Sequence, residues 1–351
     1  MKRRKPSSIL TFVIFFALFA IVMSPTALLA QQTGPGIITA KNGDNIYKIL
    51  QQNGLTESRY FNEFVEINKD NLGKNNMLIR GKKYVLPGKP LQQGDSLNKS
   101  QPENAPAKVV TEPLFGRNAE RVEVIDQQLK DAIFYLVSGH GGPDPGAMGK
   151  LGNKILCEDE YAYDITLRFG RELMRHGAKV YFIVRDPVDG IRNELYLADN
   201  KDEVCYPASK IPLNQVERLK QRVAAINALY RIDPPGMYKR CIEIHVDSRS
   251  TNTNIDVFFY FHKGSINGER LASTMRNSIE RKYQLKQPGR GYSGDVSTRQ
   301  LYMLNKTMPT AVFVELGNIQ HARDQQRLIF ENNRQALARW MCDGVMEDFQ
   351  K

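Results

Sequence analysis

The chain has 351 residues, a formal net charge of +11, 41% hydrophobic residues and 25% charged residues. The length is too great for one small domain and favours two modules with a connector, while the composition is ordinary for a soluble chain that buries a core. Neither the length nor the composition indicates an enzyme, so any argument for catalysis depends on local residues.

The first 30 residues have the pattern of a secretory signal peptide. Four basic residues at positions 2–5 precede an apolar run over 9–23, and Ala27 and Ala30 supply small residues for cleavage. The alternative is an uncleaved membrane anchor. In both cases we expect the remainder to be periplasmic or otherwise extracytoplasmic. No Cys lies near the cleavage region to accept a lipid.

The mature chain stays basic, because removal of residues 1–30 takes four positive charges and lowers the formal charge from +11 to +7. Such a protein is attracted to anionic partners, of which a bacterial cell wall is one. Nucleic acid fits poorly with export, and the chain has no basic-aromatic nucleic-acid motif. The four cysteines are scattered, so their pairing is left open.

Residues 36–88 predict a small module of the order strand, helix, helix, strand. The opening strand is expected at 37–40, and Asp44 or Asn45 is suited to cap the first helix, whose apolar residues lie at 46–50. A second helix is expected at 61–67 and a closing strand within 78–87.

The sequence of this module resembles a LysM domain, a β-α-α-β unit that binds glycans containing N-acetylglucosamine. The resemblance depends on residues 41–46, on Ile67-Asn68 and on Ile79-Arg80-Gly81-Lys82. It implies affinity for peptidoglycan glycan strands. The alternative is a structural module of the same order without glycan affinity.

Residues 89–124 are expected to form a linker, because they are rich in Gln, Asn, Pro, Ser and Lys and offer little apolar surface to bury.

Residues 125–351 predict an α/β domain with a mixed twisted sheet flanked by helices. Continuous apolar runs, as expected for strands covered on both faces, occur at 133–137, 180–184, 241–244, 257–261 and 311–314. Helical patterns occupy 158–176, 213–230 and about 324–348.

Four polar residues follow a buried strand directly or open a helix. His140, His245 and Glu315 come at strand ends, and Glu158 opens the helix at 158–176. Because ligands collect beyond the carboxyl ends of strands in open α/β sheets, we expect these residues to meet in one cleft.

Two histidines and one carboxylate form a catalytic zinc set that leaves a fourth position for water. Zn²⁺ makes hydroxide available near neutral pH, and a further carboxylate can pass the proton to the leaving amine. Glu315 is placed by sequence for that role. Taken singly, each residue is more often structural: a hydrogen-bonded histidine after a strand, or a carboxylate at a helix start or on the surface.

The run Ser138-Gly139-His140-Gly141-Gly142-Pro143-Asp144-Pro145-Gly146-Ala147 resembles the signature of zinc-dependent N-acetylmuramoyl-L-alanine amidases of the amidase-3 type. The resemblance continues through the helix at 158–176, Ile244-His245 and Val314-Glu315, and spans about 130–348. It implies that His140, Glu158 and His245 bind Zn²⁺ and that Glu315 is the general base. The implied substrate is the amide bond between N-acetylmuramic acid and L-alanine of the stem peptide.

Glu160 is a rival for the middle ligand, and we favour Glu158 because Tyr161, Tyr163 and Ile165 then fall on positions that the family usually makes apolar. The chain departs from the family pattern at 247–249 and 316–318, which puts substrate preference in doubt more than catalysis.

Two other functions stay open: a non-catalytic peptidoglycan-binding scaffold and a zinc carboxypeptidase that acts on stem peptides. Residues 186–212 and 285–298 are long enough to hold a regulatory insertion, for which a protein activator would be the partner.

Overall fold

The computed structural model describes residues 36–41, 44, 46–53, 55, 58–73, 77–87 and 108–351. The chain divides into two compact units between Lys99 and Ser100. The signal peptide expected at 1–30 lies outside the described residues. Within the described part, no helix is long and apolar enough to span a bilayer.

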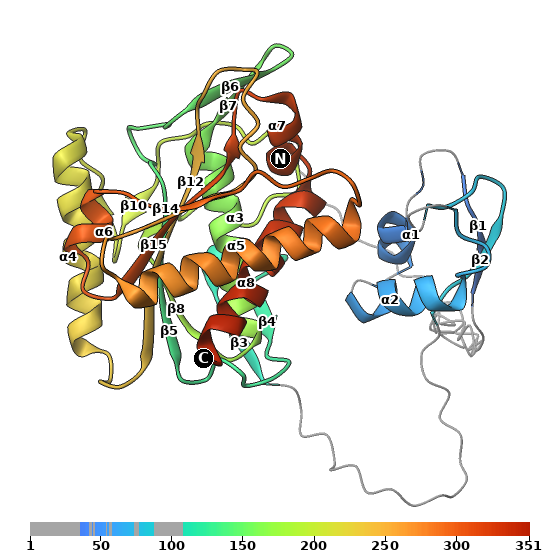
Figure 1. Cartoon of the computed structure of the whole chain (residues 1–351), viewed down its shortest axis with the longest axis horizontal. Helices are drawn as coiled ribbons and strands as arrows, with labels where there is room; N and C mark the ends of the chain where they lie inside the picture. The colour runs from blue at the N-terminus through green and yellow to red at the C-terminus, as the bar shows by residue number, and fades with distance from the viewer. Residues whose placement is uncertain are drawn as a thin grey trace, which may run out of the picture. The chain divides into compact units, whose positions relative to one another are not determined.

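Unit 1 has the predicted order of strand, helix, helix, strand (Figure 1). Its elements are β1 (Ile37–Thr39), α1 (Ile46–Gln52), α2 (Ser58–Ile67) and β2 (Lys83–Val85), and β1 pairs antiparallel with β2. The buried Asn68 joins the helices to the strands: its Nδ2 donates to the carbonyls of Phe64 and Val85, and its Oδ1 accepts from the Val85 amide. Glycan affinity of this unit stays a prediction.

The centre of unit 2 is a six-stranded sheet of order β14-β13-β15-β12-β5-β8 (Figure 1). In chain order these strands are β5 (Ala132–Ser138), β8 (Lys179–Phe182), β12 (Tyr238–Asp247), β13 (Phe258–Phe261), β14 (Val296–Thr298) and β15 (Thr310–Asn318). The strands β8, β5, β12 and β15 run parallel, and β13 runs antiparallel to β15. The sheet is therefore mixed, as predicted.

Helices cover both faces of this sheet, and β5 shows how the sequence specifies this. Its residues alternate between two buried clusters: Ala132, Phe134 and Leu136 in one, and Ile133, Tyr135 and Val137 in the other. Such alternation follows from the two-residue period of a strand. The first cluster contains side chains of α3 (Glu158–Arg175), α5 (Ile266–Lys286) and α8 (Glu331–Phe349); the second contains those of α4 (Gln215–Ile232) and α6 (Tyr302–Lys306).

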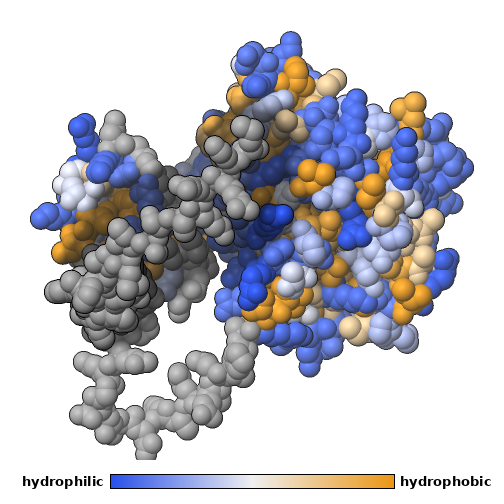
Figure 2. Space-filling model, turned by 180° about the vertical axis from the view of Figure 1, so that it is seen from behind, coloured by the Kyte–Doolittle hydropathy of each residue, from blue (hydrophilic) through white to orange (hydrophobic). Residues whose placement is uncertain are grey.

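The polarity of the surface of unit 2 agrees with a sheet whose apolar faces are covered by helices. The face seen in Figure 2 is mainly hydrophilic, with hydrophobic residues in separate small groups.

Part of the predicted linker belongs to the folded domain, which corrects the expected boundary at residue 125. Residues 108–124 form β3 (Val109–Thr111), the 3₁₀ helix η2 (Pro113–Phe115) and β4 (Arg121–Glu123), and β3 pairs antiparallel with β4. Phe115 and Val122 are buried in the first cluster. These two apolar side chains lie among polar neighbours, so the average composition of 89–124 hid them.

The remaining elements lie outside the central sheet. They are the hairpin β6 (Met148–Leu151) and β7 (Lys154–Cys157), the small sheet of β9 (Val184–Arg185), β10 (Val204–Cys205) and β11 (Ser209–Lys210), and the helix α7 (Ala322–Ile329). The helix predicted at about 324–348 is interrupted, because Phe330 takes an extended conformation between α7 and α8.

Candidate metal centre and active site

His140 lies in the turn that follows β5. Its φ of 62° is unusual for a residue with a side chain. A backbone hydrogen bond from the Gly141 amide to the Asp144 carbonyl closes the turn, and Arg222 donates to the His140 carbonyl. The ring Nδ1 lies 2.9 Å from Asp144 Oδ2 and donates to it, which directs Nε2 away from the turn.

Glu158 is the first residue of α3, and the residue is only 3% exposed. The carboxylate accepts backbone hydrogen bonds from Ala147, at 2.7 Å, and from Val246, at 2.9 Å. These bonds fix its orientation from two separate elements. A Cβ added at Gly146 would lie 2.6 Å from Glu158 Oε2, so the close approach of this loop requires glycine.

His245 lies on β12, and its ring stacks on Phe313 of the neighbouring β15 with centroids 4.2 Å apart. The ring Nδ1 lies 2.8 Å from Glu158 Oε1. The other nitrogen, Nε2, lies 3.3 Å from Glu243 Oε1. The hydrogen bond to Glu158 therefore fixes one side of the ring, whereas Nε2 lies beside Glu243 without a hydrogen-bond partner among the described residues.

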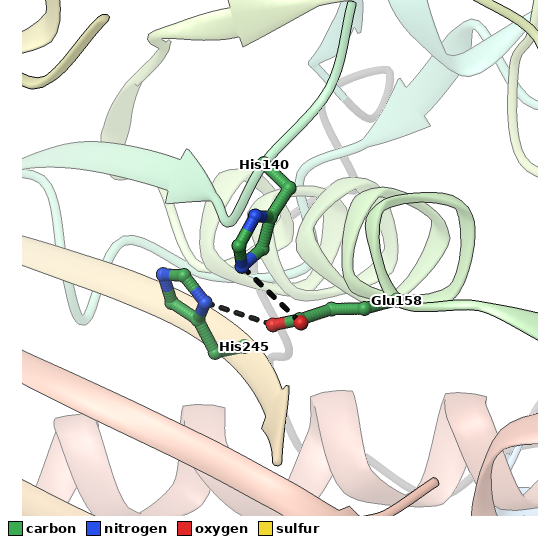
Figure 3. A group of neighbouring side chains, drawn as sticks. All are labelled: His140, Glu158 and His245. Carbon is green, nitrogen blue, oxygen red and sulfur yellow. Dashed lines mark hydrogen bonds and ion pairs between the residues drawn. The ribbon is translucent and has the colours of Figure 1, made fainter. Parts of the chain in front are cut away.

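These three side chains converge on one point (Figure 3). His140 Nε2 lies 3.2 Å from Glu158 Oε2, and one ligand atom of each residue lies within 4.8 Å of the others. Two donors at tetrahedral zinc, each about 2.0–2.1 Å from the ion, are roughly 3.3 Å apart. The observed spacing fits such an ion, and so does the donor set of two imidazoles and one carboxylate.

The electrostatics of the group also fit a cation. Burial alone would lower the pKa of each histidine, but hydrogen bonds to carboxylates raise the pKa of His140 to about 9 and that of His245 to about 10. Burial would raise the pKa of Glu158, and its bonds to both histidines hold that pKa well below its usual value. The pocket thus favours positive charge beside Glu158, which two protons or one divalent ion can supply.

Glu315 lies on β15 directly opposite His245 in the parallel register. Its side chain is 7% exposed, and Oε2 has no hydrogen-bond partner among the described residues. Burial raises the pKa of Glu315 to about 8, and the charge of Glu158 adds to this rise. A bound cation would lower that pKa again, because positive charge favours the carboxylate.

All four predicted residues line one cavity of about 450 Å³. Its other walls include Arg218, Arg299, Tyr302 and Met303. The cavity is large enough for a substrate segment to reach the convergent side chains.

The rival ligand Glu160 lies elsewhere. Its carboxylate pairs with Arg192 at 2.7 Å and accepts from the Asn200 amide at 2.8 Å. The structure thus brings Glu158, and not Glu160, beside the two histidines. Of the other histidines, His176 lies 2.8 Å from Asp126 at the end of α3, and His321 precedes α7.

Sequence reasoning missed Glu243 and Arg218. Glu243 precedes His245 by two residues, and the two-residue period of a strand places both on one face. This two-residue spacing in the sequence could therefore have indicated that Glu243 lies beside His245. Arg218 pairs with Asp144 from α4, and no local pattern indicates this contact.

The model of the N-acetylmuramoyl-L-alanine amidase family matches residues 135–347. The chain belongs to this amidase family. The amidase acts on peptidoglycan, at the amide bond between N-acetylmuramic acid and L-alanine. A comparison with curated proteins gave no match.

Three solved structures illustrate what the amidase is similar to. CwlD of Clostridioides difficile, in complex with the GerS lipoprotein, is 17% identical, with a TM-score of 0.46 and coverage of 62% of this chain and 98% of that one. AmiC2 of Nostoc punctiforme is 20% identical, with a TM-score of 0.43 and coverage of 63% and 98%. The catalytic domain of CwlV from Bacillus (Paenibacillus) polymyxa var. colistinus is 19% identical, with a TM-score of 0.43 and coverage of 62% and 97%.

Proposed function

We propose that the amidase is a zinc-dependent hydrolase in which His140, Glu158 and His245 hold the ion and Glu315 is the general base. The observation that carries this proposal is the convergence of His140 Nε2, His245 Nδ1 and the Glu158 carboxylate on one point. The donor set and its spacing fit zinc.

A zinc ion held there would act as a Lewis acid and lower the pKa of a water molecule to near neutrality. The protein's own groups do the rest. The free Oε2 of Glu315 takes a proton from the attacking water and returns it to the nitrogen of L-alanine as the C–N bond breaks. Asp144 orients the His140 ring through a hydrogen bond, and Glu243 lies beside the far nitrogen of His245.

The experiment combines metal analysis with product analysis on the purified chain. His140→Ala and His245→Ala are expected to lose both the zinc and the release of stem peptides. Glu315→Ala is expected to lose the activity and keep the zinc. Activity that survives strong chelation would contradict the zinc proposal.

Mass analysis of the products separates the amidase from the two other functions. An amidase releases intact stem peptides with a free L-alanine amino terminus, a carboxypeptidase releases a terminal amino acid, and a scaffold releases nothing. No observation favours a scaffold, because both histidines and both carboxylates are present in one cavity.

Export and wall binding are part of the same proposal. The predicted signal at 1–30 would deliver the chain to the extracytoplasmic side, and unit 1 would tether the amidase to glycan strands and raise the local substrate concentration. Binding of unit 1 to purified peptidoglycan in a sedimentation assay tests the tether. Because the catalytic cavity also binds peptidoglycan, the assay must use a chain in which the cavity no longer does so. If that chain does not sediment with peptidoglycan, the tether is excluded.

A protein activator is a further proposed partner. The expected regulatory segments contain no inserted helix: 186–212 includes β10 and β11, and 285–298 includes the last residues of α5 and β14. An activator would therefore act on a cavity that the described residues leave open. A rise in the turnover of the purified amidase on addition of wall-associated proteins would support such a partner.

A further inference from the structure

A second group of acidic side chains lies beside the first turn of α3. Asp159, Glu160 and Glu203 each place a carboxylate oxygen within 4.8 Å of the others. All three are buried, with exposed fractions of 1%, 1% and 5%. None of them takes part in the chemistry proposed above.

The hydrogen bonds of this group leave acceptor oxygens unused. Asp159 Oδ1 accepts from the Glu160 amide, but Oδ2 is buried and has no partner among the described residues. The side-chain oxygen of Asn200, whose backbone amide donates to Glu160, is likewise buried without a donor. Buried polar atoms are normally satisfied, so a buried and unpaired carboxylate oxygen in this group indicates a missing positive partner.

The charges of the group lead to the same conclusion. In the part of the chain that the structure describes, Arg192 is the basic side chain that pairs with any of the three carboxylates, and it is shared with Asp189. One arginine therefore faces three buried carboxylates. Buried charges are costly when they are unpaired, and a divalent cation would supply the missing charge.

We propose that Asp159, Glu160 and Glu203 form a second cation site, separate from the catalytic centre, that takes calcium. The candidate ligands are carboxylate oxygens, which hard cations prefer to the imidazoles that zinc favours. Calcium accepts the irregular geometry that side chains of two separate segments provide, whereas magnesium demands a near-ideal octahedron. The exposed Asp199 has an oxygen within 4.8 Å of Asp159 and of Cys157, on the solvent side of Asp159.

The role of this site follows from what its ligands touch. Asp159 follows Glu158 in the chain, and Glu203 Oε2 accepts a hydrogen bond of 2.7 Å from the Gly142 amide, two residues after His140. A cation would therefore join the segment around Glu203 to α3 and to the turn after β5. The cation would thus position α3, which carries Glu158, and the turn after β5, which carries His140. It would not touch the substrate.

Calcium titration of the zinc-loaded full chain tests this site, with isothermal calorimetry and thermal unfolding as readouts. We expect one calcium ion per chain and a rise in Tm of several degrees. The isosteric variants Glu203→Gln and Asp159→Asn should each weaken calcium binding at least tenfold. Glu194→Gln removes an exposed carboxylate of the same segment and should bind calcium like the wild type.

The outcomes are separable from those of the zinc proposal. His140→Ala lacks a zinc ligand and should keep its calcium affinity, so loss of zinc and loss of calcium report on different sites. A wild-type chain that binds no calcium would overturn the inference, whether or not the variants fold. Binding that Glu203→Gln and Asp159→Asn leave unchanged would overturn it as well, since the calcium would then lie elsewhere. A wild-type chain whose Tm does not respond to calcium, beside a Glu203→Gln chain that is more stable than the wild type, would also overturn it, since the acids would then be held by shared protons.

Discussion

Gly139 separates β5 from His140, and its replacement by alanine tests how tightly the centre is held. The added Cβ would lie 2.4 Å from both Nδ1 and Cε1 of His245. Ordinary contact begins near 3.4 Å, so the ring or the β5 backbone must move by about 1 Å. The ring has little room to retreat because it stacks on Phe313 and lies between Glu158 and Glu243.

A displacement of about 1 Å in a catalytic group can cost on the order of 100-fold in rate, which corresponds to about 2.7 kcal/mol of transition-state stabilisation. We expect Gly139→Ala to lose that much in kcat/KM for peptidoglycan fragments and to bind zinc more weakly. Gly152→Ala is the control, because it adds the same methyl group in unit 2 with no atom within 4 Å and costs only the strain of its positive φ. A Gly139→Ala chain with wild-type turnover and zinc content would refute the reasoning.

Three further outcomes are expected. Glu315→Gln keeps its shape but cannot take a proton, so kcat should fall about 10²- to 10⁴-fold while the zinc content measured by mass spectrometry is unchanged; a loss of zinc would place Glu315 among the ligands. Asp144→Asn weakens the orientation of His140 and should reduce zinc affinity about 10- to 100-fold in chelator competition; wild-type affinity would show that the bond is dispensable. Asp256→Ala leaves Arg290 without its buried carboxylate partner and Arg327 with Asp324 alone, and should cost about 3–5 kcal/mol in urea unfolding.

The carboxylate of Asp256 should also make the stability of the folded amidase sensitive to acid. Burial would raise the pKa of Asp256, but the hydrogen bond from Arg290 and the charge of Arg327 outweigh it and lower the pKa below the ordinary 3.8. The stabilisation is therefore present above that value and is lost as the pH falls through the lowered pKa. The difference in the free energy of unfolding between the wild type and Asp256→Ala should therefore decrease at acidic pH.

The sequence predicted five of the six strands, because each contains an apolar run that fits a strand buried on both faces. The edge strand β14, with the sequence Val-Ser-Thr, has no such run and was not predicted. The sequence also predicted that His140, Glu158, His245 and Glu315 meet in one cleft, because each stands at a strand end or a helix start where the topology of an α/β sheet gathers side chains. The helix α5 was not predicted, although Leu271, Met275, Ile279 and Tyr283 recur every four residues and are buried. Its strongly polar remainder masked that period.

Contacts between distant segments could not be predicted in the same way. Glu158 and Glu160 both open α3, and only the tertiary contacts with Val246 and Arg192 decide which one faces the histidines. The pairing of Glu203 with the Gly142 amide joins residues 61 positions apart, and nothing local to either segment signals it.

The most direct test of the proposed zinc centre is anomalous diffraction at the zinc absorption edge from crystals of the amidase. Our account predicts one peak bonded to Nε2 of His140, Nδ1 of His245 and a carboxylate oxygen of Glu158, each about 2.0–2.2 Å away. Crystals grown with zinc that show no peak between these side chains, or a peak bound by other residues while the enzyme is active, would contradict it.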